Sequence, residues 1–141
     1  MSQNYWGILM YGIRDYRIKY KEGEALGEVP VIKEYISKNN LDSDNPDDAL
    51  WDCIDDSVFD NAADIVVDLP NGKHVNIEWE AVEGEGRIYG FSAGYPWQAD
   101  MKNLEKRDIE DAMWQIFEPF VDMAKKDFVS EMEYISDYNG G

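Results

Sequence analysis

Cysteine, histidine and positive charge are all scarce in this chain of 141 residues. Cys53 is the only cysteine, so no disulfide can form within the chain, and we expect a reducing, cytoplasmic setting. His74 is the only histidine, and with one distant cysteine it cannot complete a zinc site. Lys and Arg number 13 against 30 Asp and Glu, and the net charge of −17 disfavours direct binding to nucleic acid or to an anionic membrane.

Long apolar runs are absent as well. The longest, from Tyr5 to Ile13, is too short to span a bilayer, and it lacks the basic stretch and cleavage site of a secretory signal. An apolar fraction of 44% and 13% aromatic residues nevertheless argue against disorder. The length suits one compact domain, so we expect a single acidic domain over residues 1–141.

The patterns along the chain predict an α+β fold. Residues 6–13 are apolar on both alternating faces, which is typical of a buried strand, and residues 63–93 indicate a three-stranded meander. Helices are expected over residues 30–38, from about 45 to 60 and from about 103 to Pro119, and a last helix follows Pro119 and runs to about Ser136. Residues 22–29 indicate a loop. We therefore expect a small, mainly antiparallel sheet packed against helices.

The register of the first hairpin can be argued from its turn. A two-residue loop would place the two apolar faces on opposite sides of the sheet. A three-residue loop, Pro70-Asn71-Gly72, instead pairs Val67 with Val75 and Ile65 with Ile77, and these three residues suit a type I turn followed by a left-handed residue. The longer loop also sets Asp68 opposite His74, a cross-strand pair that explains the histidine.

Negative charge is concentrated in one segment. Between Lys38 and Lys73 the chain has ten acidic residues, all Asp, and no Lys or Arg. Apolar residues such as Trp51 and Ile54 are interspersed among them, so this is not a low-complexity tail. A folded segment that concentrates one sign of charge accepts self-repulsion that solubility does not require, which points to a positively charged partner.

Much of this segment is predicted to be one amphipathic helix. Asn45 suits the N-cap and Pro46 the first helical position. At about 100° per residue, one face is apolar, and it comprises Leu50, Trp51, Ile54 and Val58. The opposite face carries the spaced carboxylates of Asp48, Asp52, Asp55 and Asp56. Carboxylates four residues apart are separated by about 6 Å along the helix axis, so they form a spaced row. The groove in which a basic protein binds nucleic acid would accept such a row in place of phosphates.

Phe59 allows two interpretations. If the helix continues to this residue, Phe59 lies among the aspartates and would be a binding anchor. If the helix frays first, Phe59 turns inward. On the hairpin, Asp64 is expected opposite Glu78, with Glu80 on the same side. The predicted contact residues are Asp48, Asp52, Asp55, Asp56, Phe59, Asp60, Asp64, Glu78 and Glu80.

No catalytic motif is found, and we expect no enzymatic activity, cofactor or metal. Asp42-x-Asp44 starts like a calcium loop, but Pro46 and Cys53 stand where such a loop needs a ligand, and glycine is missing at the sixth position. A metal-dependent nuclease site at Asp64, Glu78 and Glu80 stays open as an alternative.

Cys53 is expected to be a packed thiol. The N-terminal basic residues are expected to balance the acidic body, namely Arg14, Arg17, Lys19 and Lys21.

No residue-level motif identifies a family. In charge and size the chain resembles the small acidic inhibitors that phages and bacteria use against nucleases, including anti-restriction and anti-CRISPR proteins. That resemblance implies a nucleic-acid mimic that binds a basic nuclease or nucleic-acid-binding protein and occupies its DNA or RNA groove. The alternatives are an immunity protein that neutralises a toxin, a metal-dependent carboxylate enzyme, and a housekeeping interaction module. The sequence does not specify the target or the oligomeric state.

Overall fold

The computed structural model describes residues 7–82, 84, 86–92 and 104–138. These residues contain one antiparallel sheet of five strands in the order β2-β3-β4-β1-β5. The strands are β1 (Gly7–Arg14), β2 (Asp64–Asp68), β3 (His74–Val82), β4 (Gly86–Ser92) and β5 (Glu133–Tyr138). The predicted α+β fold is confirmed, including the N-terminal strand and the meander.

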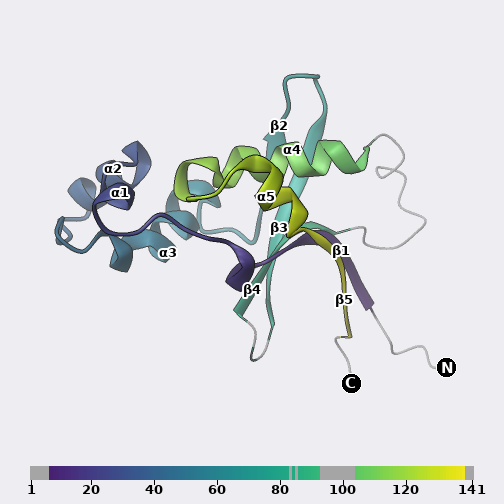
Figure 1. Cartoon of the computed structure of the whole chain (residues 1–141), viewed down its shortest axis with the longest axis horizontal. Helices are drawn as coiled ribbons and strands as arrows, with labels where there is room; N and C mark the ends of the chain where they lie inside the picture. Colours follow the sequence, from purple (N-terminus) through teal and green to yellow (C-terminus); the bar gives the residue numbers. More distant parts are fainter. Residues whose placement is uncertain (1–6, 83, 85, 93–103, 139–141) are drawn as a thin grey trace.

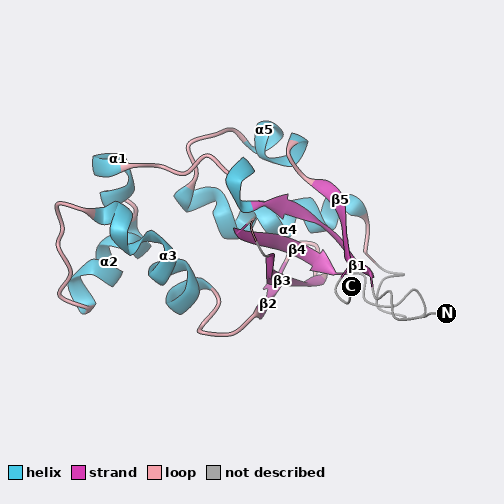
Figure 2. Ribbon diagram, turned by 90° about the horizontal axis from the view of Figure 1, so that it is seen from below, coloured by secondary structure: helices cyan, strands magenta, loops and turns pink. Residues whose placement is uncertain are grey.

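The helices form two groups. Helix α4 (Lys106–Phe117) packs on one face of the sheet, followed by η5 (Glu118–Phe120) and α5 (Lys125–Ser130). The others gather at one end of the sheet in both views (Figure 1, Figure 2). They are α1 (Gly23–Gly27), α2 (Pro30–Lys38), η2 (Pro46–Ala49), α3 (Leu50–Cys53) and η3 (Ile54–Val58). We call residues 22–61, which contain this second group, the helical lobe.

One hydrophobic core joins the helical lobe to the sheet. Ile32 of α2, Ile54 of η3 and Phe117 of α4 are completely buried in the same cluster as Tyr89 of β4. The ring of Tyr89 lies 4.9 Å from that of Phe117, edge to face. Aromatic pairs in this geometry add to the stabilisation that burial itself gives. The helical lobe is therefore held on the sheet by packing.

Strand β1 lies between β4 and β5 in the sheet, and it approaches β4 unusually closely. Gly12 of β1 faces Gly90 of β4. A Cβ atom added to Gly12 would lie 2.0 Å from the Tyr89 carbonyl oxygen, and one added to Gly90 would lie 2.5 Å from the Tyr11 carbonyl oxygen. Only glycine permits this approach, because the atoms in the way belong to the backbone.

The hairpin has the predicted register. Val67 pairs with Val75, Ile65 with Ile77 and Asp68 with His74. Gly72 adopts φ of 89°, and its N–H donates to the Leu69 carbonyl at 3.0 Å, as a three-residue turn with a left-handed last residue requires. The hairpin is therefore specified locally, by its turn and by the alternation of its strands.

The C-terminal prediction is only partly right. The helix predicted to reach Pro119 is present as α4, but the helix expected to continue to about Ser136 is wrong, because α5 ends at Ser130 and β5 follows. In β5, Ile135 pairs with Met10 of β1 and is buried beside it. Pairing with β5 satisfies the backbone hydrogen-bonding groups along the free edge of β1. The free energy of this long-range pairing outweighs the local preference of the segment for a helix. Residues 22–29, predicted to be a loop, contain the short helix α1.

The acidic helix is also more irregular than predicted. It begins at Pro46 as expected, but the side-chain amide of Asn45 donates to Asp42 at 2.9 Å instead of capping the helix. The segment is 3₁₀-helical through Ala49, α-helical through Cys53 and π-helical from Ile54 to Val58. In the π-helical turn the Phe59 N–H donates to the Ile54 carbonyl, five residues back, at 3.1 Å. This wider winding changes which side chains face the sheet.

Candidate acidic interface

The helical lobe carries most of the charge of the chain. It contains twelve acidic residues against Lys33 and Lys38, a net charge of −10 out of −17. Asp48 on η2 and Asp52 on α3 are exposed, and no Lys or Arg in the described part of the chain pairs with either. Asp60 is exposed as well and follows η3 in a left-handed conformation, with φ of 50°. These carboxylates are available to a partner.

Asp55 does not belong to this exposed group. It was predicted on the solvent face, but both its oxygens accept hydrogen bonds from the guanidinium of Arg87 on β4, one of them at 2.9 Å. The Arg87 guanidinium also lies 4.1 Å from the centre of the Trp79 ring and 6.0 Å from that of Trp51. Asp55 is therefore part of the contact that holds the helical lobe on the sheet.

Phe59 is likewise removed from the predicted contact surface. Its side chain is completely buried, and its ring stacks on Tyr89 with 6.0 Å between the ring centres. The π-helical turn places Phe59 above the buried Ile54, whereas an α-helix would have turned it toward the aspartates. The inward alternative considered for this residue is the one that the structure has.

Asp56 is exposed but already has one partner. The Tyr35 hydroxyl of α2 donates to its Oδ2 at 3.0 Å. Desolvation raises the pKa of Tyr35 to about 12, and the hydrogen bond to Asp56 and the nearby charge of Asp52 act in the same direction. The hydroxyl contacts only one of the two carboxylate oxygens, so Asp56 stays among the exposed acids that a partner could contact.

The hairpin acids form a second group. Asp64 lies opposite Glu78, as predicted, and alternation along β3 turns Glu78 and Glu80 away from the buried Val75 and Ile77. Burial raises the pKa of Glu78, and the charges of Glu80 and Asp64 raise it further, although a hydrogen bond with Ser92 opposes them. Glu78 is thus close enough to Glu80 and to Asp64 to feel the negative charge of each.

No group of three or more His, Cys, Asp or Glu side chains among the described residues has the geometry of a metal site. Asp64, Glu78 and Glu80 do not form such a group. The remaining candidates have ordinary structural roles. His74 Nδ1 lies 2.6 Å from Asp68 Oδ1, and Cys53 is buried, with its Sγ 3.8 Å from the Val31 carbonyl oxygen. Burial raises the pKa of that thiol, which suits a packed side chain.

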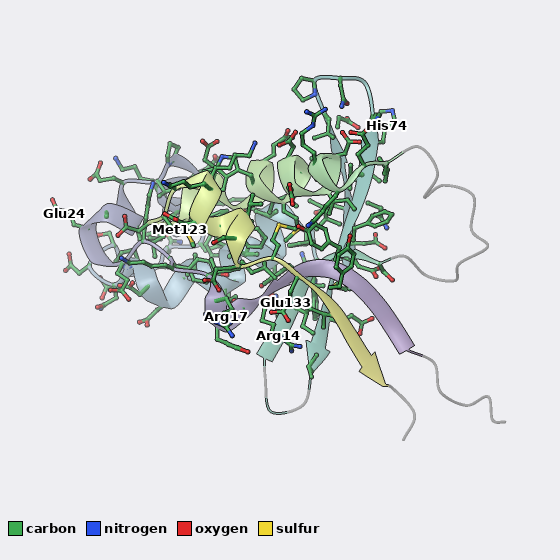
Figure 3. All side chains as sticks on the ribbon, turned by 45° about the vertical axis from the view of Figure 1, so that its right-hand side comes forward. Arg14, Arg17, Glu24, His74, Met123 and Glu133 are labelled. Atoms are coloured by element: carbon green, nitrogen blue, oxygen red, sulfur yellow. The ribbon has the colours of Figure 1, made fainter. Side chains whose placement is uncertain are left out.

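Two of the N-terminal basic residues, Arg14 and Arg17, pair with acidic residues outside the aspartate segment. Arg14 lies 3.8 Å from Glu133 and Arg17 lies 3.6 Å from Glu131, both near the C-terminal end of the described chain. Figure 3 shows Arg14 and Glu133 together beside β1 and β5, whereas Glu24 lies at the far end of the helical lobe. Both of these ion pairs therefore lie outside the aspartate segment.

Comparisons with known proteins give no match to this chain among family models, curated proteins or solved structures. None of the described helices has both the length and the apolar character that a membrane crossing needs. The charge distribution and its geometry are therefore the features of this chain that bear on its function.

Proposed function

We propose that this protein is an inhibitor that binds a basic nuclease or nucleic-acid-binding protein and occupies its DNA or RNA groove. The observation that supports the proposal most is the charge of the helical lobe, −10 over residues 22–61, with Asp48 and Asp52 unpaired among the described residues. Such a surface is complementary to the groove of a nucleic-acid-binding protein, where basic side chains replace the counterions of a phosphate backbone.

The arrangement of the exposed acids supports the same partner class. Asp48, Asp52 and Asp56 follow one another at intervals of four residues on η2, α3 and η3. Their spacing along the helix axis is about 6 Å in α-helical winding, somewhat more in the 3₁₀ part and somewhat less in the π-helical part. Repulsion between neighbouring members costs about 0.2–0.5 kcal/mol per pair. A cationic groove would offset this cost, whereas the isolated protein gains nothing from it.

Electrostatic attraction of this kind has a clear experimental signature. The immobilised protein, incubated with lysate from its host at about 0.1 M and about 0.5 M NaCl, should enrich basic nucleic-acid-binding proteins at the lower salt and lose most of them at the higher. The bound proteins should also elute with added nucleic acid, because the nucleic acid and the immobilised protein would occupy the same groove. Capture of acidic or neutral proteins alone, or capture that added salt leaves unchanged, would count against the proposal.

A further inference from the structure

The helical lobe contains a surface pocket with an apolar floor. Its volume is about 680 Å³, and it lies between α1, α2 and the loop of residues 39–46. Ile36 and Pro46 contribute to its apolar lining, together with Leu41, whose side chain is unusually open to solvent for a leucine, at 42% exposed. A concave site with apolar lining and a few polar groups is the usual form of a binding site.

The charged residues that line this pocket are mainly acidic. Glu24 and Glu28 approach it from α1 and the residue after it, and Asp44 from the loop. Lys33 is the single basic residue among the lining side chains, and its Nζ lies 3.4 Å from Glu28. That pair is exposed, at 64% for Lys33 and 68% for Glu28, so water and salt weaken it. The pocket therefore selects against anions and favours a cation.

The wall formed by the loop is already ordered. One Asp42 carboxylate oxygen accepts the Asp44 N–H at 2.9 Å, and the other accepts the Asn45 side-chain amide at the same distance. The Leu41 N–H donates to the Ile36 carbonyl of α2 at 3.0 Å, which fixes the start of the loop. A ligand that enters the pocket does not have to order this segment, so less of its binding energy is lost.

We propose that this pocket receives an arginine side chain of the basic partner. The inference rests on the proposed function and names the chemistry by which the partner is anchored. The aliphatic part of an arginine would lie on Ile36 and Leu41, while its planar guanidinium would meet the carboxylates of Glu24 and Asp44. The pocket is larger than one side chain, which leaves room for the backbone that carries it. Arginine is favoured over lysine because its fork can bind two carboxylate oxygens at once.

A peptide titration tests the pocket without the natural partner. Blocked Gly-Arg-Gly, added to ¹⁵N-labelled protein at millimolar concentration, should produce saturable NMR shifts at Glu24, Leu41 and Asp44. The matched peptide with citrulline, which keeps the shape of arginine but not its charge, should bind at least about tenfold more weakly. Arginine shifts confined to Asp48, Asp52 and Asp56, or equal shifts from both peptides, would overturn the assignment of this pocket.

A neutral substitution separates this inference from the proposed function. Leu41→Asn alters the floor without changing the charge, and it should weaken binding to the captured partner by about tenfold. Val66→Asn is the matched control, since Val66 is an apolar side chain on β2 that is 63% exposed, and it should bind as the parent does. If Leu41→Asn binds normally while loss of the lobe carboxylates abolishes binding, the arginine pocket is wrong and the groove-binding inhibitor stands. If no basic protein is captured at all, the proposed function itself fails.

Discussion

Changing Asp48, Asp52 and Asp56 together to asparagine is expected to weaken binding to the basic partner by about 10- to 100-fold at low salt. Each change removes one exposed negative charge and keeps the shape of the side chain. Asparagine at position 56 can still accept the hydrogen bond from Tyr35, so the helical packing is preserved. The melting temperature should be unchanged or slightly higher, because repulsion between residues four apart disappears. Calorimetric titration and thermal unfolding measure the two effects.

A variant with the same change in net charge is the control. Glu118→Gln, Asp122→Asn and Asp127→Asn remove three exposed carboxylates from η5, α5 and the segment between them. This variant should bind almost as well as the parent, since its charges lie outside the helical lobe. Equal weakening by the two triple variants would show that net charge alone determines binding and that the helical lobe has no special role.

Gly12→Ala is expected to prevent folding, or to lower the free energy of unfolding by more than about 4 kcal/mol. The added Cβ would meet the Tyr89 carbonyl oxygen at 2.0 Å and the Gly90 Cα at 2.7 Å. Neither atom can move without separating β1 from β4, which are adjacent strands in the middle of the sheet. Circular dichroism with urea unfolding provides the measurement.

Gly27→Ala is the matched control for this substitution. A Cβ on Gly27, the last residue of α1, would lie 3.5 Å from the Pro46 side chain, an ordinary van der Waals distance. Alanine also has the higher helix propensity, so this variant should be as stable as the parent or more so. Gly12→Ala protein that unfolds at the same urea concentration as Gly27→Ala would contradict the close approach of the two strands.

The hairpin was predictable because its determinants are local. The Pro70-Asn71-Gly72 turn and the alternation of the two strands together allow one register, and the structure has it. The same holds for α2, which begins at Pro30, and for α4, which ends two residues before Pro119 of η5. Where the chain specified an element through neighbouring residues, sequence reasoning was sufficient.

The failures come from contacts between distant segments. Strand β5 forms because β1 offers it an edge, and Ile135 suits that pairing as well as it suits a helix. Asp55 and Phe59 turn inward because a π-helical turn shifts the facing of the acidic helix, and Arg87 completes the arrangement from β4. Periodicity assumes regular winding, so it could not reveal this turn.

The candidate site was predictable to a similar extent. The charge-rich segment and the exposure of Asp48 and Asp52 follow from the sequence and the helical pattern. The pocket does not, since Glu24 and Asp44 are twenty residues apart and line the same pocket because α1 packs against Pro46 at the start of η2. Leu41 is an apolar residue among polar neighbours, and the structure leaves it exposed. It was the one feature of that stretch of sequence that could have indicated the pocket.

Competition between this protein and nucleic acid for the captured partner tests the central claim most directly. A fluorescent duplex bound by that partner should be released as the protein is added, and its anisotropy should fall to the value of the free duplex. The proposed occupation of one groove by both ligands requires this displacement. A stable ternary complex, in which the anisotropy stays high or rises, would show that the acidic lobe binds elsewhere and would contradict nucleic-acid mimicry.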